Sequence, residues 1–218
     1  MLVGLYGGTF DPVHLGHIHA ALVAKQELCL SQVRMVLAAR PGHRVEPHAS
    51  SQHRWEMLRL ACAEHGGLIP DAVELQRKGM SYTIDTVEAL HVAGDIPCWI
   101  LGQDAFATLP AWHRWQALMN FCNLVVVSRP GDVREEPREV KRLCDAHEVH
   151  RFASDAVGQV YRLRAPMLEI SATQVRALLC SRQDEKLTAN EATQDLLADP
   201  VCTYITQYQL YQTTENSV

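Results

Sequence analysis

The chain has 218 residues, of which 47% are hydrophobic, and its 25 acidic and 20 basic residues leave a formal net charge of −5. This length and apolar content suffice for one substantial domain with its own core. The acidic balance argues against a protein that coats nucleic acid or binds a membrane surface, because such proteins carry a basic excess. No apolar run reaches the length of a membrane span, so neither nucleic acid nor a membrane is an expected partner.

The seven cysteines are scattered along the chain, and no pair has CxxC spacing. Several stand in apolar runs, so we predict reduced, buried cysteines that act as small hydrophobic residues rather than zinc ligands or disulfides. The N-terminus lacks a basic stretch followed by an apolar segment. These features favour a cytoplasmic protein. The cysteines are Cys29, Cys62, Cys98, Cys122, Cys144, Cys180 and Cys202.

Short apolar runs alternate with segments of helical periodicity along the chain. In chain order, we predict a strand at 2–6, a helix at 16–30, strand 33–38, helix 51–64, strand 72–75, helix 82–92, strands 97–101 and 124–128, strand 160–163, and helices 171–179 and 200–210. The intervening stretch 130–148 is charged and predicted to be exposed. The strands are continuous apolar runs, which indicates a mostly parallel sheet covered on both faces.

Ligands of such sheets bind at the carboxyl ends of the strands. The loops at Gly7, Gly102 and Arg129 each follow a predicted strand. We therefore expect these three loops to converge on one crevice.

The first of these loops contains groups suited to phosphate. Gly7 and Gly8 allow backbone N–H groups to approach a phosphate closely, and Thr9 adds a hydroxyl donor. His14 and His17 stand at or near the start of the next helix, where an anion is favoured. Two imidazoles there can stabilise phosphoryl charge that grows in a transition state. The loop matches neither GxxxxGKS/T nor GxGxxG.

Taken by itself, an HxGH pair has simpler interpretations. The two histidines could cap the helix or pack against it. A metal site formed with His19 is less favoured, because no acidic or cysteine partner stands at helical spacing. The other histidines, His48 among them, are predicted to lie at the surface.

The run from Gly7 to His17, GGTFDPVHLGH, resembles the signature of the HxGH nucleotidyltransferase superfamily. Further segments, in order along nearly the whole chain, resemble its nicotinate-nucleotide adenylyltransferases. They are Pro41-Gly42-His43-Arg44, Arg54 with Met57-Leu58, Ser81-Tyr82-Thr83 with Asp85-Thr86, Gly102-Gln103-Asp104, Leu109-Pro110-Ala111-Trp112, Ser128-Arg129-Pro130-Gly131, Ile170 to Arg176, and Asp199 to Tyr211. The chain departs from the family pattern at Gly42, where a second proline is usual, and at Arg44, where lysine is frequent.

The resemblance implies an α/β fold, with a Rossmann-like doubly wound parallel sheet and a small helical C-terminal region. It implies a single nucleotidyltransferase domain over 1–218, of which 165–218 form the helical C-terminal part. The implied reaction transfers the adenylyl group of ATP to nicotinate mononucleotide and yields nicotinate adenine dinucleotide and pyrophosphate, a step of NAD biosynthesis. Mg²⁺ is expected to enter with ATP, held mainly by phosphates and water, and no protein metal cage is expected.

Site roles follow from the same resemblance. The residues implied to be catalytic are His14, His17 and Thr9. The residues implied to bind ATP are Gly7, Gly8, Phe10, Gly102, Asp104, Ser171, Thr173 and Arg176. The residues implied to bind nicotinate mononucleotide are His43, Arg44, Tyr82, Thr83, Trp112 and Arg129. Tyr82 and Thr83 would offer backbone N–H groups to the nicotinate carboxylate, and Trp112 would stack on the pyridine ring.

Each role has an alternative. Arg176 could be a solvated helix charge, Asp104 could cap a helix, and Trp112 with Trp115 could belong to the core.

Two other functions also stay open. One is an adenylyltransferase of the same superfamily that acts on pantetheine phosphate or nicotinamide mononucleotide. The other is a nucleotide-binding regulatory module without turnover. The oligomeric state is left open.

Overall fold

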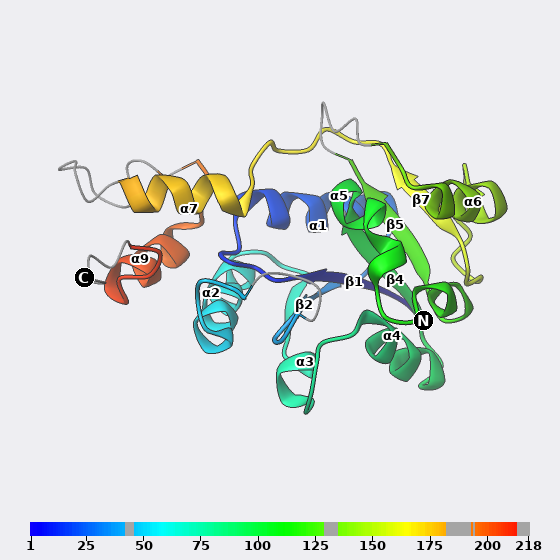
Figure 1. The fold of residues 1–218 in the computed structure, drawn as a ribbon, viewed down its shortest axis with the longest axis horizontal. Helices are drawn as coiled ribbons and strands as arrows, with labels where there is room; N and C mark the ends of the chain where they lie inside the picture. The colour runs from blue at the N-terminus through cyan, green and yellow to red at the C-terminus, as the bar shows by residue number, and fades with distance from the viewer. Residues whose placement is uncertain (42–45, 129–134, 182–192, 194, 213–218) are drawn as a thin grey trace.

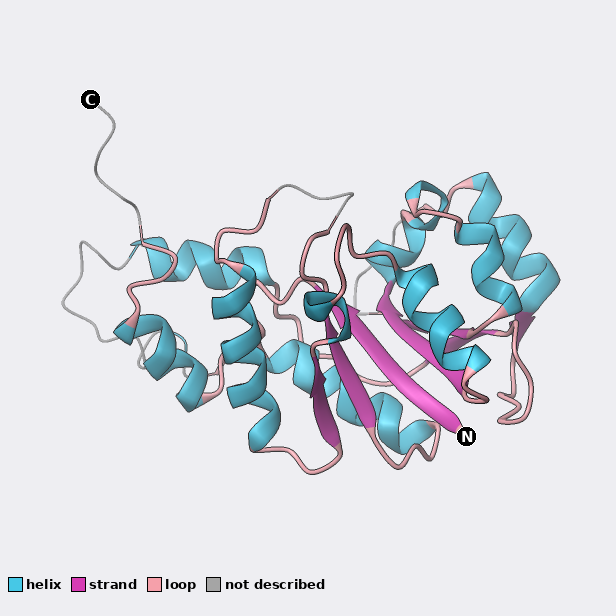
Figure 2. Ribbon diagram, turned by 90° about the horizontal axis from the view of Figure 1, so that it is seen from below, coloured by secondary structure: helices cyan, strands magenta, loops and turns pink. Residues whose placement is uncertain are grey.

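A computed structural model describes residues 1–41, 46–128, 135–181, 193 and 195–212 of the chain. Within these residues, seven parallel strands form one sheet in the order β3-β2-β1-β4-β5-β7-β6. Figure 2 shows the strands side by side with helices around them. The strands are β1 (Leu2–Gly8), β2 (Val33–Leu37), β3 (Leu68–Asp71), β4 (Ile96–Gly102), β5 (Asn123–Val127), β6 (Glu148–Val149) and β7 (Val160–Leu163).

Helices cover both faces of this sheet. On one face, residues of α1, α2, α7 and α9 share a core with strand residues such as Met35 and Ile100. On the other, α4, α5, α6 and two 3-10 helices pack on strand residues such as Trp99 and Val126. Figure 1 shows α7 and α9 at the opposite end of the molecule from α6. The helices are α1 (Leu15–Glu27), α2 (Ser51–Ala63), α3 (Val73–Gln76), α4 (Thr83–Val92), α5 (Gln103–Ala107), η1 (Leu109–Ala111), η2 (Trp115–Asn120), α6 (Arg138–His147), α7 (Ala172–Ser181) and α9 (Asp199–Gln207).

The strand order reverses beside β1. The chain runs from β1 outward to β2 and β3, then returns to place β4 on the other side of β1 and continues to β5. Loops that leave β1 and β4 therefore diverge to opposite faces, and a crevice opens at the carboxyl ends of these two strands. The predicted Rossmann-like doubly wound sheet is confirmed, and the crevice lies where the sequence placed the Gly7 and Gly102 loops.

The prediction of a strand at 72–75 is wrong. The third strand is Leu68–Asp71, which pairs in parallel with Val33–Val36 of β2, and the following residues form α3. The Asp71 carboxylate explains the change of direction, because its Oδ1 accepts the Val73 N–H at 2.9 Å and its Oδ2 lies 2.6 Å from Arg34 Nη2. The segment predicted as a strand therefore begins a helical turn, because the carboxylate of the preceding Asp71 accepts the Val73 N–H.

The charged stretch predicted to be exposed at 130–148 is partly a packed helix. Residues 130–134 lie outside the described part of the chain, but Arg138–His147 form α6. Val140 and Leu143 of α6 are buried against the second core. The charged residues of α6 occupy its remaining faces, so the helix is amphipathic. The charged composition of the segment did not reveal this pattern.

The cysteine prediction holds for four residues and fails clearly for one. Cys62, Cys98, Cys122 and Cys202 are buried, as predicted. Burial raises the pKa of the Cys62 thiol to about 12, so this side chain stays protonated and inert. Cys29 is exposed, because it follows α1 in a left-handed conformation with φ 51° that turns the chain toward β2.

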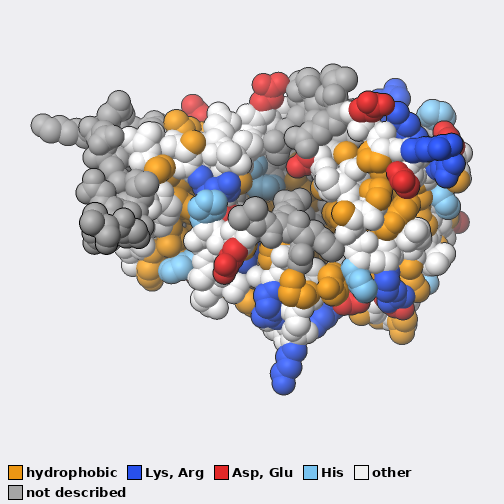
Figure 3. Space-filling model, viewed as in Figure 1, with side chains coloured by type: hydrophobic (Ala, Val, Ile, Leu, Met, Phe, Trp, Pro, Cys, Tyr) orange, Lys and Arg blue, Asp and Glu red, His pale blue; other side chains and the backbone are white. Residues whose placement is uncertain are grey.

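Figure 3 shows small groups of acidic and basic side chains scattered over one face, without a broad basic patch there. Among the described residues, no helix combines the length and apolar character needed to cross a bilayer.

Candidate active site

Two adjoining cavities open at the carboxyl end of the sheet. The larger has a volume of about 620 Å³. It is lined by every residue predicted to be catalytic or to bind ATP, namely Gly7, Gly8, Thr9, Phe10, His14, His17, Gly102, Asp104, Ser171, Thr173 and Arg176. These residues come from β1, α1, the β4–α5 junction and α7, so the fold brings together four segments that are far apart in sequence.

The smaller cavity has a volume of about 100 Å³. It is lined by the predicted substrate residues Tyr82, Thr83 and Trp112. The two cavities share part of their walls, which consists of Gly7, Gly8, Thr9 and Trp112. The other three residues predicted to bind substrate, His43, Arg44 and Arg129, lie outside the described residues.

Packing explains the two glycines of the phosphate loop, the segment from Gly7 to Asp11 that is predicted to receive phosphate. A Cβ on Gly7 would lie 2.1 Å from the Trp99 ring, and one on Gly8 would lie 2.7 Å from the Phe10 ring. Phe10 itself has a left-handed φ of 49° and is buried, so its ring is held beneath the loop. The glycines therefore let the loop lie flat on two aromatic rings, which leaves its backbone exposed to the shared wall of the cavities.

The two histidines form one stacked unit at the start of α1. Their ring centroids are 3.6 Å apart with an angle of 28° between the planes, and the Phe10 ring meets His17 edge-on at 5.1 Å. The backbone N–H of His14 donates to Nδ1 of His17 at 3.2 Å. Because Nδ1 accepts, a neutral His17 carries its proton on Nε2. The histidines thus do cap the helix, as the simpler interpretation held, and the same contact directs the protonated nitrogen away from the backbone.

The start of α7 contributes a second set of polar groups. Ser171 caps the helix, because its Oγ accepts the Gln174 N–H at 3.2 Å. Arg176 Nη1 donates to the Asp11 carbonyl at 2.7 Å, and its Nη2 donates to Thr173 Oγ1 at 3.3 Å. These bonds use two of the five N–H groups of the guanidinium, so Arg176 can also contact an anion in the cavity. Arg176 is therefore fixed to the phosphate loop rather than being a solvated helix charge.

The opposite wall is organised around Gly102 and its neighbours. Gly102 caps α5, and Asp104 in the first turn is exposed, so Asp104 is not itself the cap. Between them, buried Gln103 donates from Nε2 to Glu136 at 2.8 Å and accepts from Arg162 Nη1 at 3.2 Å. Burial opposes the charge of Arg162, but its hydrogen bonds with Glu136 and Glu148 outweigh burial and raise its pKa. This ion-pair network holds the Gly102–Asp104 turn in place from behind.

Aromatic side chains and the start of α4 enclose the smaller cavity. Tyr82 and His113 stack with centroids 4.3 Å apart, and Trp112 packs half-buried between the cavity and the second core. Thr83 is the first residue of α4, a ten-residue helix whose leading N–H groups favour an anion. Trp112 thus belongs to both the core and the cavity, so the two interpretations of this residue are compatible.

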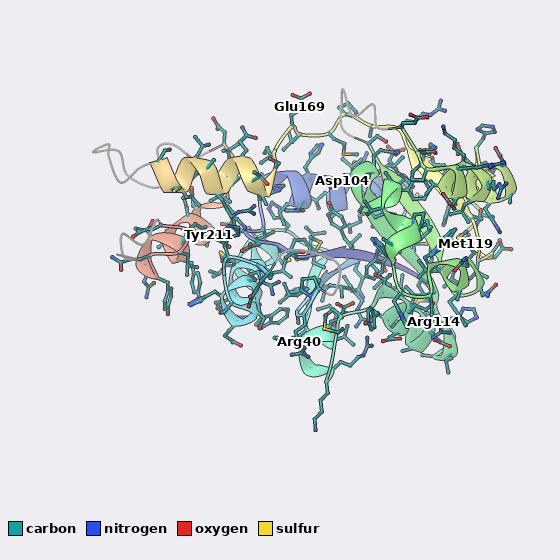
Figure 4. All side chains as sticks on the ribbon, viewed as in Figure 1. Arg40, Asp104, Arg114, Met119, Glu169 and Tyr211 are labelled. Carbon is teal, nitrogen blue, oxygen red and sulfur yellow. The ribbon has the colours of Figure 1, made fainter. Side chains whose placement is uncertain are left out.

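Arg40 connects the loop before α4, residues 77–82, to the segment that follows β2. Its backbone N–H donates to Ser81 Oγ at 3.1 Å, and its carbonyl accepts the Ser81 N–H at 3.0 Å. Its guanidinium donates to the carbonyls of Gly79 and Arg77. Figure 4 shows Arg40 beside α3, at the side of the molecule where this loop runs. The segment that leads into Tyr82 and Thr83 is thereby fixed before any ligand enters.

Buried Arg54 holds several loops together, a role that the sequence pattern did not predict. Its side chain is 1% exposed. Its guanidinium donates to four backbone carbonyls, those of Thr9, Ala38, Ala39 and Ala49, at 2.7 to 3.1 Å. Burial lowers the pKa of Arg54, while nearby Asp11 opposes that effect. Two signals in the sequence pointed to this residue: its match to the family pattern together with Met57-Leu58, and its position in line with Leu58 and Ala61 on the apolar face of a predicted helix.

Glu74 in the smaller cavity was also missed. It is buried, and its Oε1 accepts the Thr86 hydroxyl at 3.1 Å; Thr86 in turn accepts from Arg77 Nη1 at 3.2 Å. Burial raises the pKa of Glu74, whereas the hydroxyls of Ser81 and Thr86 and the charge of Arg77 lower it less strongly. Burial therefore disfavours a negative charge on Glu74 beside the start of α4. No local pattern indicated this position, because Glu74 lies within the segment 72–75 that was wrongly predicted to be a strand.

Glu74→Gln is expected to change how stability depends on pH. A raised folded pKa means that the native state binds this proton more tightly than the unfolded chain. As pH falls through the folded pKa toward the ordinary value of 4.5, the wild type should therefore become more stable relative to the variant. The difference between their free energies of unfolding should shift in favour of the wild type over this range. Urea unfolding of both proteins at several pH values measures this difference. A difference independent of pH would show that Glu74 does not titrate with a raised pKa.

Comparison with known proteins agrees with this geometry. Residues 5–178 match the model of the cytidylyltransferase-like family. The chain is 40% identical over 218 residues to a protein of Aeromonas salmonicida (strain A449) named "Probable nicotinate-nucleotide adenylyltransferase", with 96% of this chain and 97% of that protein covered. A Pseudomonas aeruginosa protein of the same name is 38% identical over 215 residues, with the same coverage.

Solved structures extend the likeness to the fold. The structure of nicotinic acid mononucleotide adenylyltransferase of Plasmodium falciparum complexed with NaAD aligns with a TM-score of 0.72 and 16% identity, covering 96% of this chain and 97% of that one. An identity this low supports the fold alone, but the curated relatives match at higher identity over nearly the whole length. The chain belongs to the cytidylyltransferase-like family and, within it, to the nicotinate-nucleotide adenylyltransferases.

Proposed function

We propose that this chain transfers the adenylyl group of ATP to nicotinate mononucleotide and releases nicotinate adenine dinucleotide and pyrophosphate. The observation that carries this proposal is the shared wall of the two cavities. An ATP in the larger cavity and a pyridine nucleotide that enters from the smaller one would bring their phosphates together over Gly7, Gly8 and Thr9. The names of the relatives support the same pair of substrates.

The chemistry needs no nucleophile from the protein. A phosphate oxygen of nicotinate mononucleotide forms a bond to the α-phosphorus of ATP, and the bond from that phosphorus to the oxygen bridging to the β-phosphate breaks. The electron pair of the broken bond leaves with pyrophosphate. Because the attacking group is already anionic, catalysis rests on positioning and on stabilising charge.

His17 and Arg176 are suited to this stabilisation. With Nδ1 occupied by the His14 N–H, His17 would donate from Nε2 to a phosphoryl oxygen. Arg176, fixed through the Asp11 carbonyl, would place its positive charge on the departing pyrophosphate from the other side of the cavity. Both groups are held by backbone contacts before substrate binds, so little reorganisation is needed in the transition state.

ATP would enter as its magnesium complex. Among the described residues, no group of three or more His, Cys, Asp or Glu side chains is placed to hold a metal ion. Mg²⁺ would be carried by the phosphates of ATP and by water, and the ion would neutralise phosphate charge as part of the substrate. Gly102 and Asp104 would receive the adenosine, because a carboxylate accepts from ribose hydroxyls.

The smaller cavity would select the acid form of the pyridine nucleotide. The leading N–H groups of α4 at Tyr82 and Thr83 favour a carboxylate, and Trp112 offers an aromatic face to the ring. The scattered cysteines support a place in the reducing cytoplasm.

Product analysis tests this proposal. The protein is incubated with ATP, Mg²⁺ and nicotinate mononucleotide, and both products are quantified by chromatography. The expected result is equal amounts of nicotinate adenine dinucleotide and pyrophosphate, lost when the metal is chelated. Binding of ATP without release of pyrophosphate would contradict the proposal and favour a nucleotide-binding module.

A further inference from the structure

The Asp11 carboxylate joins several segments behind the phosphate loop. It is buried, and its Oδ2 accepts the His48 N–H at 2.8 Å while its Oδ1 accepts the Ala49 N–H at 3.1 Å. His48 Nδ1 lies 3.4 Å from the same Oδ2. Arg176 Nη1 lies 4.0 Å from Oδ2 and bonds to the Asp11 carbonyl. The position of this carboxylate therefore affects both the phosphate loop and Arg176.

The end of the chain supplies a further donor to this carboxylate. The Tyr211 hydroxyl donates to Asp11 Oδ1 at 2.8 Å, across 200 positions of sequence. Figure 4 places Tyr211 where α2, α7 and α9 come together. Burial raises the pKa of Tyr211, with the charge of Asp11 and the hydrogen bond to it adding to the effect, so the hydroxyl stays protonated as a donor.

The backbone after α9 is shaped to make this contact. Gln209 and Tyr211 have left-handed φ values of 52° and 64°, which residues other than glycine seldom adopt. These two turns direct the chain from the end of α9 back toward Asp11. A sparsely populated conformation persists where surrounding contacts hold it, and the buried hydrogen bond to a carboxylate is such a contact.

We propose that Tyr211 is a positioning residue for adenylyl transfer, acting through Asp11 on the phosphate loop and on Arg176. The proposal rests on the proposed function, because it concerns the same site. Tyr211 touches no reacting atom; its hydroxyl fixes the carboxylate that orders the groups which do. Loss of the hydroxyl would let Asp11 shift, and small displacements of catalytic groups lower the rate of the chemical step more than they lower binding.

Tyr211→Phe tests this role, because it keeps the ring and removes only the hydroxyl. We expect kcat to fall about 10-fold or more, with the KM for ATP changed less than about threefold. Tyr204→Phe is the matched control. Its hydroxyl also leaves the C-terminal segment, but it bonds His53 Nδ1 at 3.0 Å outside both cavities. The control should keep wild-type kcat, and thermal unfolding of both variants shows that each is folded at the assay temperature.

A double-mutant cycle with Asp11→Ala, which removes both acceptor oxygens, shows whether Tyr211 acts through Asp11. If it does, adding Tyr211→Phe to Asp11→Ala lowers kcat much less than it does in the wild type. A Tyr211→Phe enzyme with kcat within about twofold of the wild type would overturn the proposal, as would an equal loss in Tyr204→Phe. Absence of activity in the wild type would instead refute the proposed function, so the two failures are distinguishable.

Discussion

Replacing His17 by alanine is expected to lower kcat about 100- to 1,000-fold, the usual loss when one preorganised donor to transition-state charge is removed. The expectation follows from the geometry of the ring. Nδ1 accepts the His14 N–H at 3.2 Å, so a neutral His17 carries its proton on Nε2, and His17 lines the larger cavity. The KM for ATP should change much less than kcat, because the charge that His17 meets grows mainly in the transition state. Steady-state kinetics of pyrophosphate release measure both quantities.

His19→Ala provides the control on the same helix. His19 bonds the Pro166 carbonyl through Nε2 at 2.9 Å and does not line either cavity. This variant should retain kcat within about twofold. If His17→Ala kept a rate close to that of the wild type, the assignment of His17 to the transition state would be wrong, and the stacked pair would serve only to cap α1.

Arg54→Ala is expected to lower the free energy of unfolding by at least about 3 kcal/mol. The substitution leaves four backbone carbonyls without their donor and removes the positive charge near buried Asp11. It also leaves a cavity where the side chain was fully enclosed. For a chain of this length, such a loss lowers Tm by roughly 10 °C. Thermal and urea unfolding measure the effect.

Arg59→Ala is the matched substitution on the same helix. Arg59 is exposed and pairs with Glu56 at 3.5 Å, so its loss should cost less than about 0.5 kcal/mol. A cost for Arg54→Ala as small as that of the control would show that water replaces the guanidinium at the four carbonyls. The loops at Thr9, Ala38 and Ala49 would then be held by other contacts.

Periodicity was enough to predict most of the sheet. Runs such as Leu2 to Tyr6 and Leu124 to Val127 contain no charged residue and are dominated by apolar side chains, as is typical of strands buried on both faces. The prediction failed where local contacts decided the outcome. The Asp71 carboxylate accepts the Val73 N–H at the first residue of α3, and it also pairs with Arg34 of the neighbouring strand β2. A single-sequence pattern has no access to such a partner.

The sequence predicted residues that line the two cavities, but it did not predict the residues that support them. His14, His17 and Arg176 belong to contiguous motifs, and the fold brings these motifs to one cavity. Arg54 and Tyr211 act through backbone carbonyls and through Asp11, at sequence separations that carry no local pattern. Residues that orient a site from behind become visible only when the tertiary contacts are known.

Acceptor preference tests the central claim most directly. Initial rates of pyrophosphate release are measured with ATP and Mg²⁺ and, in turn, nicotinate mononucleotide, nicotinamide mononucleotide and phosphopantetheine at equal concentrations. We expect kcat/KM for the nicotinate form to exceed that for the nicotinamide form at least about 10-fold, because the start of α4 favours a carboxylate. Phosphopantetheine should give no measurable rate. A preference for either of the other acceptors would contradict the assignment of the smaller cavity to nicotinate.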